Sequence, residues 1–281
     1  MFFLCFFCSM AGNYSRKTED LGNNKVSHTA GVQVEISGIV SIALEAITLC
    51  ANIFPALTVF LLKRSRLRSV TDCFIGALAL NDLTSVAIPL GVGIPTLLKR
   101  RWLGGGSSCV LYQISSLWFQ INGMVLVTIM SYDRFLALRK PMLYRREIQK
   151  KPRRIKLAVF AMFVFTLAFA SLPAAGLANT SIRFPLTYCP CLLITKPNHS
   201  KEYVFPILYI ALGYSTFLMV SGCNYSVLKV LSNFKERFQS RKLTIDRQKF
   251  EKSSLIAFTK LILVLGVLFY LTWMPAMVSR F

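Results

Sequence analysis

The sequence predicts an all-α protein, a bundle of helices that crosses a lipid bilayer repeatedly. Three observations lead to this fold class. The 281 residues are 54% hydrophobic and only 16% charged, whereas a soluble domain carries about 25% charged residues. The apolar residues gather in six long blocks, and most basic residues lie in every second connection between these blocks. Lipid is therefore the expected solvent.

Each apolar block is long enough for a helix that spans the bilayer, which needs roughly 20 apolar residues. Helices are favoured because they satisfy their own backbone hydrogen bonds in lipid. We expect an N-terminal tail over 1–36, a bundle over 37–279 and a short end at 280–281. The six expected spans are 37–62, 71–98, 108–138, 155–178, 203–231 and 255–279.

The basic residues predict the orientation of the bundle. Counted with the span ends beside them, the first, third and fifth connections carry four, ten and nine Lys or Arg, which is 23 of the 33 in the chain. The counts run from Lys63 to Arg68, from Arg134 to Lys156 and from Lys229 to Lys260. The positive-inside rule places these connections in the cytoplasm and the N-terminus outside the cell. Membrane topology thus accounts for the net charge of +21, and a nucleic-acid partner is not expected.

Glycosylation sequons give a second indication of the same topology. They begin at Asn13, in the tail, and at Asn179 and Asn198, both in the connection between the fourth and fifth spans. All three lie on the predicted outer side, where glycosylation is possible. The sequon at Asn224 lies inside a span and is interpreted as a chance match. The opening MFFLCFFCSM lacks a basic start and is interpreted as an uncleaved terminus rather than a signal peptide.

Polar residues inside the spans are candidate functional groups, because charge within a bilayer is costly. Asp82 lies in the second span, Asn52 lies in the first, and Glu45 precedes Asn52 by about two turns. Asp82 can be a hydrogen-bond anchor between helices, or a cation site or part of a switch. One buried carboxylate can serve both purposes, so both interpretations stay open.

Two further features lie at or near the ends of spans. Asp133 and Arg134 mark the cytoplasmic end of the third span. They predict either an ion pair that reaches into the headgroups or a latch that Arg134 leaves when the cytoplasmic face opens. Pro275 interrupts the sixth span beside Trp273. A proline kink lets one half of a helix swing against the other, and Trp273 and Phe269 would respond to that swing.

Together these motifs resemble the rhodopsin-like G protein-coupled receptors, and six of them occur in order between residues 52 and 275. The Asp133-Arg134-Phe135 triplet is similar to the D/E-R-Y motif of that family, and it follows Cys109 at the family's spacing. The other matches are Asn52 in the first helix, Leu78–Asp82 for LAxxD, Trp102 with Cys109, Pro141 seven residues after the arginine, and Trp273-x-Pro275.

A narrower resemblance is to the prostanoid receptors, above all those for prostaglandin E. It is carried by Trp102 in the first outer loop, by Leu172–Leu177 after a fourth helix without the usual tryptophan, by Pro185–Cys189, by Cys223-Asn224, and by Gly123. The chain departs from that pattern at Tyr188, where tryptophan is usual, at Pro190-Cys191, and at Gly93 and Leu97. It also ends at Phe281, before the seventh helix of the receptor type, so six spans are expected.

The resemblance implies roles for several residues. Cys109 and Cys189 would form a disulfide that ties the second outer loop over the third helix, with Cys191 as the alternative partner. Thr187 would offer a hydroxyl to an acidic, prostanoid-like ligand, or it is an ordinary hairpin residue. Trp273 would line the same pocket. The implied partners are an extracellular small molecule, a heterotrimeric G protein and the bilayer of the plasma membrane.

Other classes of function have less support in the sequence. The eight cysteines and two histidines form no metal-ligand pattern, and we find no nucleophile–base pair or phosphate-binding glycine loop. No enzyme activity, metal or cofactor is therefore expected. A six-span transporter would show an internal repeat, which we do not find. The remaining alternatives are a receptor fragment that does not signal and a receptor for a peptide or another ligand.

Overall fold

The computed structural model describes residues 39, 42–43, 45–62, 70–88, 91, 105–144, 146, 152–177, 180–182, 191–193, 204–239, 264 and 267. Within this part of the chain the fold is helical, apart from one small hairpin. Three helices are long and apolar enough to cross a membrane, over Val70–Ala87, Val110–Arg139 and Val204–Val230. A shorter apolar helix covers Glu45–Leu61. The expected all-α class is confirmed.

The first helix packs closely against the second. Glu45–Leu61 is helical, and its last turn widens into the π-helix η1, Thr58–Leu62. The neighbouring helix α3, Val70–Ile88, presents Gly76 at this contact. A Cβ atom on Gly76 would lie 2.9 Å from Cγ1 of Val59, so only a glycine permits the observed approach of the two helices.

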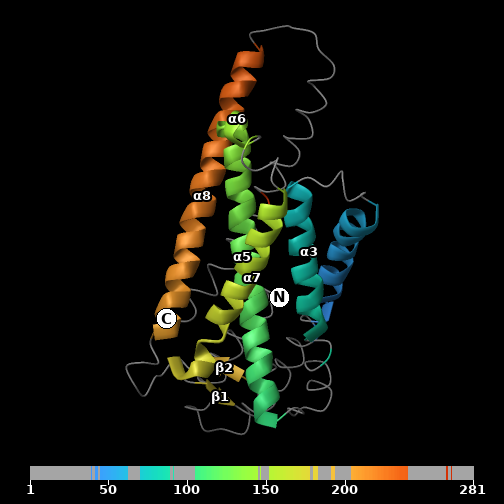
Figure 1. Cartoon of the computed structure of the whole chain (residues 1–281), viewed down its shortest axis with the longest axis vertical. Coiled ribbons are helices and arrows are strands. Elements are labelled where there is room, and N and C mark those ends of the chain that lie inside the picture. Colours follow the sequence, from blue (N-terminus) through green and yellow to red (C-terminus); the bar gives the residue numbers. More distant parts are fainter. Residues whose placement is uncertain are drawn as a thin grey trace, which may run out of the picture.

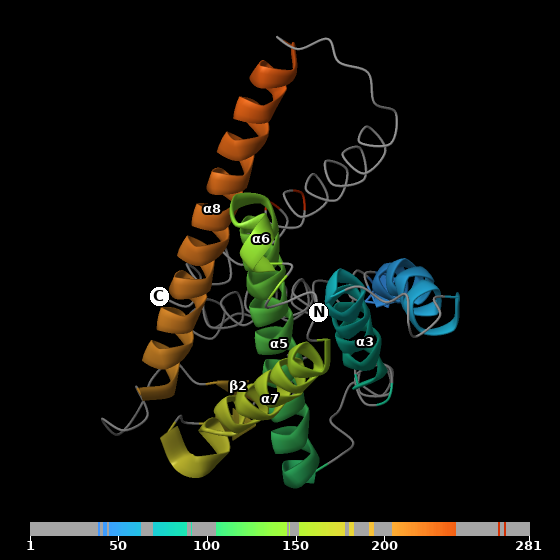
Figure 2. The ribbon, with the colours of Figure 1, turned by 45° about the horizontal axis from the view of Figure 1, so that its top comes forward.

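Helix α5, Gly105–Arg139, runs through the centre of the structure. It lies between α3 and the long helix α8, Val204–Gln239, while α7, Pro152–Ala170, crosses it obliquely (Figure 1, Figure 2). Because α5 contacts all three helices, it supplies more buried side chains than any other described element. The sequence predicted this third span at 108–138, close to the observed bounds of α5.

Proline explains the short elements next to α5 and α7. Helix α6, Pro141–Leu143, begins at a proline, where a missing N–H costs nothing, and the amide of Tyr144 closes it by bonding to the Pro141 carbonyl. Helix α7 ends at Ala170 rather than near the expected 178. Since Pro173 cannot continue an α-helix, the chain passes into the π-helical turn η5, Pro173–Leu177.

The strands form a hairpin beside the first turns of α5. Strand β1, Thr180–Ile182, pairs antiparallel with β2, Cys191–Leu193, so that Ile182 faces Cys191. Strand β2 contacts α5, and Figure 1 shows the hairpin at the end of the bundle away from α6. This hairpin belongs to the expected connection between the fourth and fifth spans.

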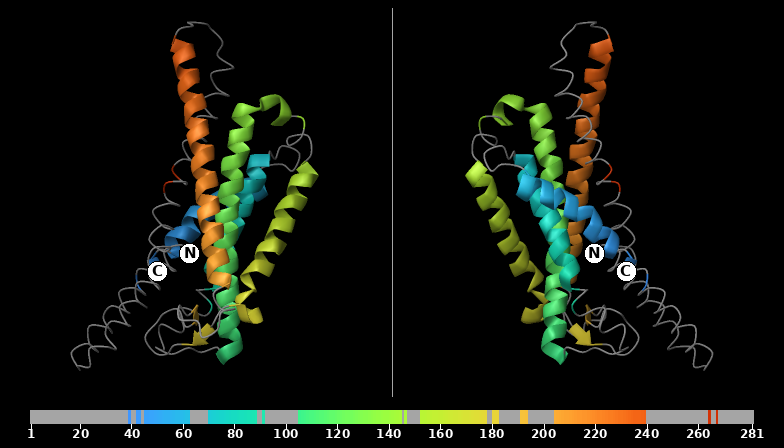
Figure 3. Two further views of the ribbon diagram at one scale, coloured as in Figure 1. Left: turned by 90° about the vertical axis from the view of Figure 1, so that its left-hand side faces the viewer. Right: turned by 90° about the vertical axis from the view of Figure 1, so that its right-hand side faces the viewer.

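Helix α8 is longer than the span expected at 203–231, since it continues to Gln239. Its 36 residues correspond to about 54 Å, whereas the hydrocarbon core of a bilayer is about 30 Å thick. The C-terminal part of α8 extends past the end of α5 (Figure 1, Figure 3). The helix therefore reaches beyond the membrane on the side of α6.

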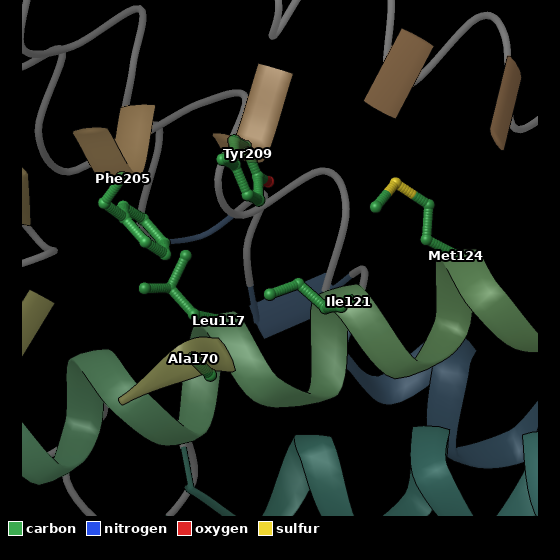
Figure 4. Packing of buried hydrophobic residues seen from close by; sticks show 6 residues of the cluster. All are labelled: Leu117, Ile121, Met124, Ala170, Phe205 and Tyr209. Atoms are coloured by element: carbon green, nitrogen blue, oxygen red, sulfur yellow. The ribbon is translucent and has the colours of Figure 1, made fainter. Parts of the chain in front are cut away.

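The larger apolar cluster lies where α5 meets α7 and α8 (Figure 4). Phe205 on α8 is fully buried, and its ring stacks on Tyr209 at 6.0 Å between centroids. The buried members of the cluster are Leu117, Ile121, Met124, Ala170, Phe205 and Tyr209. A second cluster at the other end of α5 joins Val70, Phe74 and Met130, against which Ile155 and Val159 of α7 pack. Together the two clusters hold α5 along its length.

Candidate functional site

The C-terminal end of α5 carries a buried ion pair. The Nη2 atom of Arg134 lies 3.4 Å from Oδ2 of Asp133, and the two residues are only 9% and 5% exposed. The arginine therefore does not extend toward the headgroups in this conformation. Both side chains lie between helices, so a movement of the helices changes their surroundings.

Two residues from other elements complete a closed network around this pair. The guanidinium of Arg134 donates a hydrogen bond to Oγ1 of Thr71 at the start of α3. The hydroxyl of Tyr144, just after α6, hydrogen-bonds to both Asp133 and Thr71. The network thus connects α3, α5 and the connection after α6, and Asp72 adds its negative charge within electrostatic reach of Arg134.

The environment of Tyr144 favours its neutral hydroxyl. Burial raises the pKa of Tyr144 to about 12, and the negative charge of Asp133 and the hydrogen bond to it act in the same direction. A neutral tyrosine donates its proton to the Asp133 carboxylate, whereas a tyrosinate would repel it. The hydroxyl of Tyr144 therefore stays protonated at neutral pH and donates a hydrogen bond within the network.

Phe135, the third residue of the motif, lies outside this network. Its ring stacks with Tyr132 at 6.2 Å between centroids, and the guanidinium carbon of Arg139 lies 5.5 Å from the ring centroid. These contacts follow from the spacing of three and four residues along one helix face. Phe135 thus contributes to side-chain packing along α5 rather than to the ion pair.

The polar residue Asp82 of the second span is connected to α5 through Asn81. The amide nitrogen of Asn81 donates to Oδ1 of Asp82 at 3.3 Å and to the carbonyl of Phe119 at 3.2 Å. Asp82 therefore meets α5 through its neighbour. Asn52, by contrast, donates to the Thr48 carbonyl of its own helix at 3.0 Å. Among the described residues, no three acidic, histidine or cysteine side chains are placed to hold a metal ion.

Polar contacts from α5 hold α7 in place, although α7 lacks a tryptophan. The indole Nε1 of Trp118, on α5, donates to the Phe163 carbonyl of α7 at 3.0 Å, and the two rings meet edge to face at 6.2 Å. One turn further along α5, the carboxamide oxygen of Asn122 accepts a hydrogen bond from the hydroxyl of Thr166. A tryptophan on α5 thus makes the contact between these two helices.

Several predicted site residues lie outside the described part of the chain. They are Asn13, Asn179, Thr187, Cys189, Asn198, Phe269, Trp273 and Pro275. Cys109 lies in α5, and Cys191 lies in β2, but the description does not extend to their side chains. The expected disulfide, the glycosylation sites and the proline kink therefore stay predictions.

The sequence did not reveal four residues that the structure brings into these sites. Thr71 and Tyr144 belong to the network of Arg134, and Asn122 and Thr166 join α5 to α7. A signal existed for the last two, because a polar residue in an apolar span tends to face another helix. Thr71 and Tyr144 lie among many polar residues at the ends of spans, so nothing in the sequence distinguished them.

Known proteins similar to this chain include prostaglandin receptors. The chain is 29% identical over 166 residues to the bovine prostaglandin E2 receptor EP4 subtype, covering 58% of this chain and 32% of that receptor. It is 27% identical over 215 residues to the human EP3 subtype, covering 70% of this chain and 54% of that receptor. The chain thus spans between about a third and a half of the length of these two relatives.

Fold and sequence agree on a broader family. Squid rhodopsin, a solved structure, superposes with a TM-score of 0.70 at 18% identity, covering 87% of this chain and 69% of that chain. Residues 52–281 match the domain of the 7 transmembrane receptor (rhodopsin family). This chain therefore belongs to the rhodopsin family of multi-pass membrane receptors, which are not enzymes.

Proposed function

We propose that this chain acts as a G protein-coupled receptor of the plasma membrane, with its N-terminus outside the cell, and that its ligand is a prostanoid or a similar lipid acid. Membership of the rhodopsin family supports the receptor role. Similarity to prostaglandin E2 receptors supports the ligand class. The 23 basic residues of the three inner connections support the orientation.

The observation that carries the signalling part of the proposal is the closed network at the cytoplasmic end of α5. In this network Arg134 is buried, paired with Asp133 and bonded to Thr71. An agonist activates the receptor by binding more tightly to an arrangement in which these contacts are broken. Arg134 then becomes available to a segment of the G protein, and a hinge at Pro275 in the sixth span provides the opening.

An apolar edge lies next to this network and suits a protein partner. Met142 of α6 is 82% exposed, and Leu143 beside it is exposed as well. Large exposed apolar side chains next to polar groups mark surfaces for interaction. The basic residues of the three inner connections would be attracted by anionic lipid headgroups and would help to position the partner at the membrane. A heterotrimeric G protein fits a surface of this composition.

The extracellular end is proposed to hold the ligand. A disulfide between Cys109 and Cys189 would tie the loop that follows β1 to the start of α5, and β2 already contacts α5. Thr187 in this loop would donate to the acid group of the ligand, and Trp273 would line the pocket. Asn52 and Asp82 would provide the polar or cation site within the membrane, and Asn13, Asn179 and Asn198 would carry glycans.

The proposal is tested in cells that express the whole chain. We expect specific binding of tritiated prostaglandin E2, and a cyclic AMP or calcium response to at least one prostanoid of a panel. Arg134→Ala should abolish the response and leave binding within a few-fold. Arg153→Ala, an exposed arginine of α7, is the matched control and should retain both.

Two outcomes would contradict the proposal. Silence to every prostanoid together with a response to a peptide or an amine would reject the ligand class. Binding of a prostanoid without any second-messenger response, at normal surface expression, would reject the signalling role and leave a receptor fragment that only binds. Surface staining with an antibody against an N-terminal tag, without permeabilisation, tests the orientation.

A further inference from the structure

Buried polar side chains from three helices bond at the middle of α5. Asn81 of α3, Asn122 of α5 and Thr166 of α7 are 3%, 0% and 2% exposed. Each lies in an apolar segment of its helix, so their side-chain atoms must find partners inside the protein. This place is distinct from the network of Arg134, which lies twelve residues further along α5, about 18 Å along the helix axis.

Counting donors and acceptors leaves one of each without a partner. Asn81 donates from Nδ2 to the Phe119 carbonyl and to Asp82, but its Oδ1 atom accepts nothing from any described residue. Asn122 accepts from Thr166 through Oδ1, but its Nδ2 atom finds no acceptor in the described part of the chain. A buried polar atom without a partner lowers the folding equilibrium constant roughly tenfold.

The two atoms meet the same turn of α5. Asn81 bonds to the carbonyl of Phe119, and Asn122 follows Phe119 by three residues. Residues at this spacing are neighbours on a helix surface, with Cβ atoms about 5 to 6 Å apart. Asn81 and Asn122 thus bond at neighbouring positions of α5, which is the scale that one water molecule with two hydrogen bonds of about 2.9 Å spans. A bridging water can accept a hydrogen bond from one atom and donate one to the other. The donor Nδ2 of Asn122 and the acceptor Oδ1 of Asn81 meet this requirement.

We propose that Asn81 and Asn122 bind one buried water molecule, which accepts a hydrogen bond from Nδ2 of Asn122 and donates one to Oδ1 of Asn81. Such waters occur about once per 27 residues in folded proteins and satisfy buried polar groups. Here the water joins α3 to α5, while Thr166 joins α5 to α7. The three helices thereby share one polar junction in a bundle whose fourth span carries no tryptophan.

Substitution of Asn122 by leucine distinguishes a hydrated junction from a dry one by the sign of its effect. Thr166 would keep a partner in Asn122→Leu, because its hydroxyl also lies 3.0 Å from the carbonyls of Met162 and Phe163. In a dry junction the substitution removes only an unpaired donor, and the thermal midpoint rises. In a hydrated junction the water and Oδ1 of Asn81 lose their partner, and we expect the midpoint to fall by about 2 to 4 °C.

A double-mutant cycle then tests whether Asn81 and Asn122 act through a shared molecule. Asn81→Ala and Asn122→Leu together should lower the midpoint by less than the sum of their separate effects. Gln113→Leu is the matched control, since Gln113 is also buried on α5 and its Nε2 atom has no partner among the described residues. It precedes Asn122 by nine residues, about 13 Å along the axis, so its effect should add to that of Asn81→Ala.

Infrared difference spectroscopy detects the water itself. Exchange into water labelled with oxygen-18 should shift a buried O–H stretching band in the unmodified chain and in Gln113→Leu. That band should be lost in Asn122→Leu. A rise of the midpoint in Asn122→Leu, or strict additivity with Asn81→Ala, would refute the proposal. If a variant fails to fold, a density map of the unmodified chain at a resolution that shows ordered water decides the question.

Discussion

Replacement of Tyr144 by phenylalanine removes a single oxygen atom from the network that restrains Arg134. That oxygen is the donor to the Asp133 carboxylate and a partner of Thr71. The phenylalanine ring keeps the apolar packing of the half-buried tyrosine. Any effect of Tyr144→Phe therefore reports on the hydrogen bonds rather than on packing.

The expected loss of stability follows from the hydrogen bonds of the hydroxyl. A hydrogen bond to a charged group is worth about 1.5 to 3 kcal/mol, and partial exposure of Tyr144 to solvent reduces this value. We expect Tyr144→Phe to lower the free energy of unfolding by about 1 to 2 kcal/mol, and to raise basal signalling, since Arg134 loses a restraint.

The stability that Tyr144 contributes should depend on pH in a way that identifies this residue. Because the folded-state pKa of Tyr144 is raised, the stability from its neutral hydroxyl is fully present below pH 10.0 and is lost as the pH rises through about 12. Thermal unfolding of detergent-solubilised protein between these values should therefore show a steeper loss in the unmodified chain than in Tyr144→Phe. Ultraviolet difference absorbance between the two proteins should show one tyrosine that ionises late.

The matched control is Tyr132→Phe, because Tyr132 lies on α5 and is 42% exposed. We expect this control to leave the thermal midpoint and the basal signal close to those of the unmodified chain. If Tyr144→Phe also left both quantities unchanged, the hydroxyl would have no energetic part in the network. The interpretation of Arg134 as a restrained switch would then lose its structural basis.

Two further substitutions test the packing of α3 and α7. Gly76→Leu should destabilise the chain by about 1 to 3 kcal/mol, because a Cβ atom alone would lie 2.9 Å from Val59. The control is Gly222→Ala, since its Cβ atom would meet nothing within 4 Å. Thermal unfolding in detergent measures the stability of both variants. Trp118→Phe keeps an aromatic ring but loses the donor to the Phe163 carbonyl, so a loss of about 1 kcal/mol is expected; an unchanged midpoint would show that this bond contributes nothing.

Long apolar blocks and the placement of basic residues were enough to predict a helical membrane protein. The block at 108–138 corresponds to α5, Gly105–Arg139, because the residues that leave the membrane at its ends are polar. Helix ends were predicted less well. Helix α7 stops at Ala170, near Pro173, and α8 continues to Gln239, because a helix can extend into water without any change in backbone hydrogen bonding.

Family motifs identified Asp82, Asp133 and Arg134 as candidates, since charge inside or beside a bilayer is costly and stands out in a sequence. They did not identify the partners of these residues. Asn81 connects Asp82 to α5, and Thr71 and Tyr144 surround Arg134. These contacts depend on how helices cross, which periodicity along one helix does not encode.

The sequence by itself determined the class of solvent and the family, because hydropathy and motif spacing can be read along the chain. The orientation stays a prediction from the placement of the basic residues. Only the tertiary structure decided which polar groups share a site. Asn81 and Phe119 are 38 positions apart, and Thr71 and Arg134 are 63 apart, yet each pair meets on α5 or at its end. Packing brings such residues together, since buried donors and acceptors must find partners across helices rather than along them.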